Sequence, residues 1–156
     1  MAAIDIGCAA IDRGSSVGAQ TTVNTGNPAN ASGKITSIEI WAANSMGACE
    51  IATFYVVSGN NLSTRDTEYI GDVTAGAKRT FNVDLNVQEG DYIGVYYVTG
   101  TIERELSGGD GYWGAAGDQI PCTDYLFSFG AGRVISLYGT GVTPEAGNAI
   151  FMGCNF

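Results

Sequence analysis

The sequence contains no histidine, only 3 prolines among 156 residues, and 7 basic against 16 acidic residues. Without histidine the chain can form neither a Ser-His-Asp triad, nor a Cys-His nucleophile pair, nor a His-ligated zinc site. The formal net charge of −9 opposes the counterion release that drives nucleic-acid binding, and it disfavours anionic membranes. We therefore expect no nucleic-acid partner and none of these histidine chemistries.

Long apolar runs are also lacking. No stretch approaches the roughly 18 consecutive apolar residues of a membrane-spanning helix, so no membrane insertion is expected. The first residues have neither the basic segment nor the apolar run of a secretory signal. This start predicts synthesis in the cytoplasm, as for a virion protein; the alternative is an extracellular protein whose signal was removed.

Glycine, in contrast, is abundant, with 23 residues, about double its usual share of roughly 7%. The glycines follow no Gly-X-Y period, which excludes collagen, and a hydrophobic content of 45% argues against disorder. Glycine combined with many Val, Ile, Thr and Tyr residues is typical of a turn-dense all-β domain.

The hydrophobic pattern supports this class. Four apolar residues alternate with polar ones and predict a half-buried strand at 79–88; they are Phe81, Val83, Leu85 and Val87. Residues 92–98 are apolar on both faces, as in a central strand, and Gly94 within them indicates a bulge or a close approach of another strand. In a strand at 34–43, we expect Ile38 and Ile40 on one face and Ile35 and Trp41 on the other. The remaining strands are expected at 49–57, 69–73, 99–106, 125–129 and 133–138, with Gly139-Thr140-Gly141 ending the last.

Eight or nine strands with frequent turns and no helical period predict a single-domain antiparallel β-sandwich over residues 1–141. Long crossing loops favour a jelly roll, and an immunoglobulin-like sandwich is the alternative. Residues 142–156 are expected to form a linker and an apolar tail. This tail either completes its own sheet or adds a strand to a neighbouring subunit, through the candidate assembly residues Ile150, Phe151, Met152 and Phe156.

A glycine-rich loop expected at 107–118 holds the best candidate contact residues. Tyr112 and Trp113 could stack on a sugar, and Asp110 and Asp118 could bind its hydroxyl groups. The alternatives are that the aromatic residues anchor the loop on the sandwich or pack against another subunit. Asp110 and Asp118 are also the only candidate Ca²⁺ ligands, without EF-hand spacing, and no other cofactor is expected.

Catalysis has one candidate pair. Glu103 and Glu105 share a strand face, as the two carboxylates of a glycosidase could at roughly 5–10 Å. Two solvated carboxylates are the favoured interpretation, so we assign no catalytic residue and expect no enzyme.

Four cysteines lie far apart, at positions 8, 49, 122 and 154, which excludes a zinc ribbon. If they are oxidised, we prefer the disulfides Cys8–Cys154 and Cys49–Cys122, because the first would join termini that often lie close together. The alternative is four free, mostly buried thiols, as expected in a reducing cytosol.

Several short segments between residues 3 and 141 carry a family resemblance. The most specific are residues 3–7, 27–30, 38–41, 54–58, 63–66, 73–76, 90–94, 120–123 and 136–141. On these segments the chain resembles small β-sandwich, jelly-roll-like proteins of unassigned function found in tailed-phage and environmental viral sequences.

The resemblance implies a structural role on the virion, in head decoration or as a tail or fibre subunit. The expected partners are other virion subunits, including copies of the chain itself in a homo-oligomer. A carbohydrate-binding module or lectin-like adhesin with a glycan partner is the first alternative. A secreted fibre subunit that assembles by strand exchange is the second.

Overall fold

The computed structural model describes residues 2–18 and 20–144. Within them the chain forms thirteen β-strands and no helix, and every paired strand is antiparallel, which confirms the predicted all-β antiparallel class. The strands are β1 (Ala3–Gly7), β2 (Ser15–Val17), β3 (Thr21–Asn24), β4 (Gly33–Ser58), β5 (Asn61–Val73), β6 (Lys78–Val87), β7 (Tyr92–Tyr96), β8 (Thr99–Glu105), β9 (Tyr112–Ala115), β10 (Tyr125–Leu126), β11 (Ser128–Gly130), β12 (Val134–Ile135) and β13 (Leu137–Val142). None of the described residues belongs to a helix long and apolar enough to cross a membrane.

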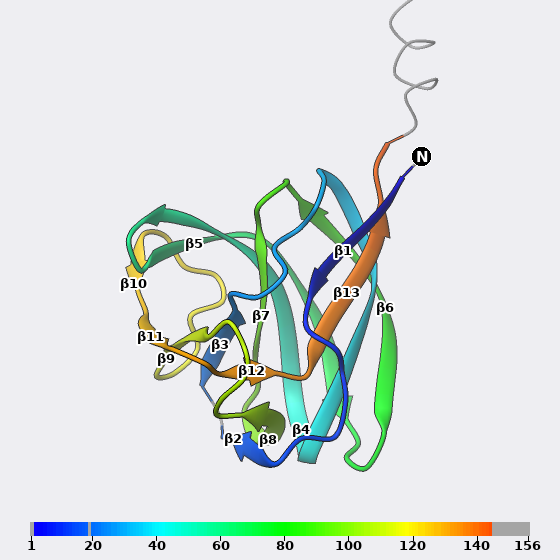
Figure 1. Cartoon of the computed structure of the whole chain (residues 1–156). Helices are drawn as coiled ribbons and strands as arrows, with labels where there is room; N and C mark the ends of the chain where they lie inside the picture. The colour runs from blue at the N-terminus through cyan, green and yellow to red at the C-terminus, as the bar shows by residue number, and fades with distance from the viewer. Residues whose placement is uncertain (1, 19, 145–156) are drawn as a thin grey trace, which may run out of the picture.

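Strand β4 organises the molecule. Its 26 residues were expected as two separate strands, at 34–43 and 49–57, but the segment between them is also paired, through β8 and the end of β5. The first half of β4 lies between β13 and β6, and the second half lies between β5 and β7. One strand therefore runs through both layers of the fold (Figure 1).

The first layer has the order β1-β13-β4-β6. Val83, Leu85 and Val87 of β6 are buried while the residues between them are exposed, which confirms the predicted alternation. Ile35 and Ile38 both lie in the core, contrary to the expected split, because a β-bulge between Ile35 and Ser37 shifts the alternation by one residue.

Gly139 and Gly141 lie inside β13 instead of ending it. A Cβ atom at Gly141 would collide with the carbonyl oxygen of Lys34 on the neighbouring β4. The glycine permits this close backbone approach beside the bulge in the β13–β4 pairing.

The second layer runs β5-β4-β7-β3-β9-β11 and then closes on itself. At one edge β10 pairs with β5, at the other β11 pairs with β9, and β10 and β11 follow one another in the chain. Residues 125–130 thus bridge the two edges (Figure 1). The closure leaves few unpaired edges in this layer.

Two hydrophobic cores lie on opposite faces of this second layer. The larger core fills the space between the layers and includes Ile51, Ile93 and Val95. The smaller core includes Ala52, Phe54 and Phe127, with Tyr92 and Tyr96 packed against it; its other members are Val23, Leu62, Trp113 and Ile120. Strand β7 is therefore covered on both faces, as predicted. The architecture is consistent with a β-sandwich, with an additional core covered by the segment after β9.

Gly94 of β7 marks a close approach, as predicted. A Cβ atom there would lie 2.8 Å from the Phe54 ring, the Thr22 carbonyl oxygen and the Val23 side chain. Only glycine lets β3 and β4 pack this tightly on either side of the central strand.

Candidate functional site

Tyr112 and Trp113 lie on strand β9 and not in an irregular loop, as was expected for residues 107–118. The two side chains are 2% and 6% exposed. The predicted stacking of a sugar on these rings is therefore wrong, and the alternative, that they anchor the segment onto the fold, is what the structure shows.

The contacts of Trp113 explain its burial. Its ring packs edge-on against Tyr92, with centroids 4.9 Å apart, and against Phe129 at 6.3 Å. The indole N–H donates to the side-chain oxygen of Asn60 at 3.0 Å, which satisfies its one polar group. Trp113 thus fixes β9 against β7, β11 and the turn that follows β4.

Tyr112 points to the opposite face of β9, into the larger core. Its hydroxyl oxygen accepts a hydrogen bond from Arg104 Nη1 at 2.9 Å. This contact joins β9 to β8 beneath the surface.

Asp110 and Asp118, expected to share one site, are exposed at opposite ends of β9. Asp110 lies near Gly26 and Cys8, whereas Asp118 follows the strand and accepts a hydrogen bond from the backbone N–H of Ile120 at 3.0 Å. Because the four-residue strand separates them, they cannot bind one Ca²⁺ ion together. Among the described residues, no group of three or more Cys, Asp or Glu side chains could hold a metal ion.

Glu103 and Glu105 share a face, as predicted, but Glu103 is buried and only Glu105 remains partly exposed to solvent. Glu103 is 7% exposed and accepts the backbone N–H of Arg13 at 2.7 Å, while Glu105 accepts that of Gly14 at 2.8 Å. The two carboxylates hold the loop between β1 and β2 in place. This arrangement gives them a structural role.

The structure contains no Cys49–Cys122 disulfide. Cys49 lies in the larger core and Cys122 packs beside the smaller one, and both are free thiols, as is Cys8. Burial raises the pKa of Cys49 to about 12 and also raises that of Cys8. The predicted partner of Cys8, Cys154, lies outside the described residues, as do the assembly residues Ile150, Phe151, Met152 and Phe156.

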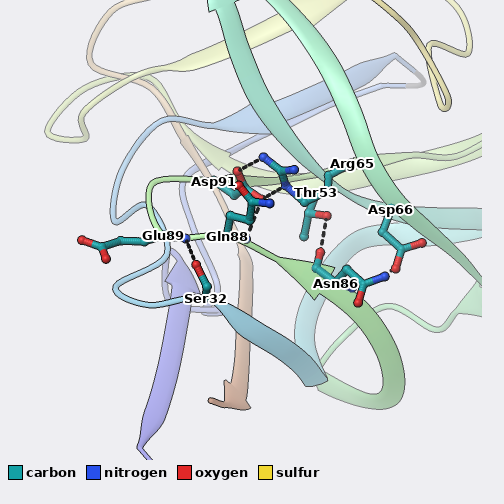
Figure 2. Close-up of polar contacts among 8 residues, drawn as sticks. All are labelled: Ser32, Thr53, Arg65, Asp66, Asn86, Gln88, Glu89 and Asp91. Carbon is teal, nitrogen blue, oxygen red and sulfur yellow. Dashed lines mark hydrogen bonds and ion pairs between the residues drawn. The ribbon is translucent and has the colours of Figure 1, made fainter. Parts of the chain in front are cut away.

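An ion pair between the partly buried Arg65 and the buried Asp91 joins β5 to the turn between β6 and β7 (Figure 2). Arg65 binds both carboxylate oxygens of Asp91, with Nη2 3.0 Å from Oδ1, and the backbone N–H of Gln88 donates to the same carboxylate at 2.9 Å. The Tyr55 ring centroid lies 4.6 Å from Arg65 Cζ on the other side. Hydrogen bonding to Asp91 raises the pKa of Arg65. These groups are committed to one another, so we assign the pair a structural role.

Exposed apolar side chains gather where β4, β5 and β10 meet. Val56 and Tyr125 lie opposite Leu62, which is itself buried in the smaller core, and Leu126 lies opposite Asn61. We call five residues of this region the hairpin-end patch, with exposures between 38% and 67%: Tyr55, Val56, Val57, Tyr125 and Leu126.

An open pocket of about 470 Å³ over β9 and β11 shares Tyr125 and Leu126 with this patch, and its volume is in the range of small-molecule sites. Tyr112 and Gly114 of β9 line it together with Ser128 and Gly130, which lie opposite Gly114 and Tyr112 on β11. Other lining residues are Gln20, Tyr125 and Arg133.

The side chains of Arg133 and Gln20 pack closely against two glycines of this pocket, Gly130 and Gly114. A Cβ atom at Gly130 would lie 2.8 Å from Arg133 Cδ, and one at Gly114 would lie 2.8 Å from Gln20 Nε2. The glycines therefore make room for a guanidinium and an amide to lie close to the sheet. No motif in the sequence singles out Gln20 or Arg133. The two residues are far apart in the chain, and they come to one pocket only because β3 pairs with β9 and β9 pairs with β11.

Comparisons of the chain with protein-family models, with curated proteins and with solved structures gave no match.

Proposed function

We propose that the protein is a non-enzymatic structural component of a virion, made in the host cytoplasm, that acts by assembling with other virion subunits, including copies of itself. The observation that carries the proposal is the hairpin-end patch. Val57 near the end of β4 and Leu126 on β10 are 46% and 67% exposed, and large apolar side chains exposed in one region of the surface mark protein contact sites. The sequence resemblance to small phage β-sandwich proteins supports the same role.

The proposal is tested first on the particle. Mass spectrometry of purified virions should detect the chain in stoichiometric amounts, and cryo-electron microscopy should place it with the hairpin-end patch against another subunit. Absence from the particle would contradict the proposal.

The second test is in solution. The variant Val57→Ser/Leu126→Ser should reduce self-association, measured by analytical ultracentrifugation, and incorporation into particles. Val98→Ser is the matched control, because Val98 is 58% exposed but lies outside the patch, after β7. Equal effects of the patch and control variants would contradict assembly through the patch.

A carbohydrate-binding role is the second candidate function. The observation that favours it is the pocket over β9 and β11, which combines an exposed Tyr125 with the amide of Gln20 and the hydroxyl of Ser128. A glycan array tests this role, and Tyr125→Ala should reduce the signal; no glycan binding at all would remove this candidate.

A further inference from the structure

The seven basic residues of the chain are all described, and six of them have committed side chains. Lys34, Arg65 and Lys78 form ion pairs, while Arg13, Arg79 and Arg104 donate hydrogen bonds to carbonyl or hydroxyl oxygens. Within the described residues, the guanidinium of Arg133 alone has neither an ion pair nor a hydrogen bond. The Arg133 guanidinium instead lies over the Tyr112 ring, whose centroid is 5.8 Å from Arg133 Cζ.

The surroundings of Arg133 are unusual for this protein. The chain carries 16 acidic residues, yet none of the Asp and Glu residues that the structure describes lines the pocket in which Arg133 lies. The pocket therefore keeps one positive charge without a local counter-ion on a protein of net charge −9. An arginine with an unused planar set of donors is suited to bind a carboxylate through two parallel hydrogen bonds.

The other lining groups indicate what the carboxylate would be attached to. Tyr125 is 40% exposed, and its ring is fixed by edge-on packing against Phe127 at 5.7 Å, so it offers an ordered aromatic surface. Gln20 and Ser128 supply an amide and a hydroxyl group. A pyranose ring has an apolar C–H surface and a rim of hydroxyl groups, which this combination can match.

We propose that this pocket binds a carboxylate-bearing saccharide, with Arg133 pairing with the carboxylate and Tyr125, Gln20 and Ser128 contacting the sugar ring. The inference rests on the second candidate function, carbohydrate binding, and adds the class of sugar. The small volume of the pocket and its single cation favour one acidic sugar unit. An extended polyanion would be repelled by the overall negative charge of the protein.

The test is an NMR titration of the intact chain with methyl glucuronide, the methyl glycoside of N-acetylneuraminic acid, and methyl glucoside as the neutral counterpart. At least one acidic sugar should bind about tenfold or more tightly than the glucoside, because a hydrogen bond between a guanidinium and a carboxylate is stronger than one between neutral groups. Arg133→Gln should abolish this preference. Gly130→Ala, which keeps the charge but displaces the arginine side chain, should weaken it.

The matched control is Arg79→Gln, which removes the same charge from a residue hydrogen-bonded at the turn between β5 and β6. It should leave the preference unchanged, and circular dichroism should show that all variants are folded. Binding of acidic and neutral sugars alike, unaffected by Arg133→Gln, would overturn the acidic specificity while leaving carbohydrate binding in place. If no sugar binds, both fail, and equal affinity for acetate would show that the pocket binds a bare carboxylate and no saccharide.

Discussion

Two polar side chains illustrate how single residues set the stability of this fold. Tyr97 is fully buried, and its hydroxyl group donates to the carbonyl oxygen of Val17 at 2.6 Å, with the Gly18 carbonyl oxygen 2.9 Å away. Burial raises the pKa of Tyr97, so the group stays protonated and remains a donor at neutral pH. Glu50 illustrates the opposite case, a carboxylate whose ionised form is disfavoured in the folded chain.

We expect Tyr97→Phe to lower the free energy of unfolding by about 1–3 kcal/mol, because it leaves carbonyl oxygens near Val17 without their donor. Urea denaturation measures this change. The control is Tyr69→Phe, since Tyr69 is 65% exposed. If both substitutions have the same small effect, the Tyr97 hydroxyl group does not contribute to stability.

The pH dependence of Glu50 has a defined sign. Burial, and to a smaller extent the nearby Asp118 carboxylate, raise the pKa of Glu50 in the folded state. The folded chain therefore binds this proton more tightly than the unfolded chain, and stability falls as the pH rises from the unfolded pKa of about 4.3 through the folded pKa.

We therefore expect Glu50→Gln to be more stable than the wild type at pH 7, with the difference disappearing below about pH 4.3. Denaturation curves across this pH range measure it. Asp118→Asn should act in the same direction at neutral pH. A Glu50→Gln variant that is no more stable than the wild type at pH 7 would show that ionised Glu50 carries no penalty.

At the scale of elements, carboxylates of β5 stabilise neighbouring segments. The backbone N–H groups of Asp84 and Asn86 on β6 donate to Glu68 and Asp66 of β5, at 2.7 and 2.8 Å (Figure 2 shows the Asp66 contact). These contacts satisfy N–H groups on a strand whose one partner among the described strands is β4. Arg65, which precedes Asp66 on β5, binds the turn between β6 and β7 through Asp91.

We expect Arg65→Met to destabilise the protein by about 3 kcal/mol, because it leaves the Asp91 carboxylate, whose side chain is 3% exposed, without its counter-ion. The control is Lys34→Met, which breaks an ion pair of exposed side chains and should cost less than about 1 kcal/mol. Adding Asp91→Asn to Arg65→Met should recover part of the loss. Chemical denaturation of the wild type, Arg65→Met, Asp91→Asn, their double variant and the Lys34→Met control measures these energies. A zero coupling energy between Arg65 and Asp91 would contradict the assignment.

At the scale of the whole molecule, the segment 125–130 closes the second layer and seals the smaller core. Phe127 is 2% exposed in the middle of this segment and packs edge-on against Phe54 at 6.1 Å. The two core clusters are distinct, so loss of the closure should affect them unequally.

We expect Phe127→Ala to cost about 3–5 kcal/mol. Hydrogen exchange should show loss of protection around β10 and β11 before β6 and β13, since the latter border only the larger core. Leu126→Ala, at an adjacent residue that is 67% exposed, should change stability by less than about 0.5 kcal/mol. Uniform loss of protection would show that the two cores unfold as one unit.

Local patterns predicted the strands whose alternation is regular. The β6 alternation, the central place of β7 and the close approach at Gly94 followed from residues within a few positions of one another. The predictions failed where distant segments act on the chain: the bulge beside Ile35, the unbroken course of β4, and the strand at Tyr112 and Trp113. Strand β9 pairs with β3, about ninety residues earlier, and no local signal records that partner.

The sequence by itself determined the all-β class, since side-chain alternation and turn-forming glycines act locally, and it excluded histidine-based chemistry through a missing residue. Only the tertiary structure decided which polar and aromatic groups are available to a ligand. It buried Trp113, separated Asp110 from Asp118, and left the Arg133 guanidinium, in the same pocket as Tyr125, without an ion pair to any described residue. The physical reason is that burial and charge pairing depend on which segments meet in space, and strand pairing brings together residues that are far apart in the chain.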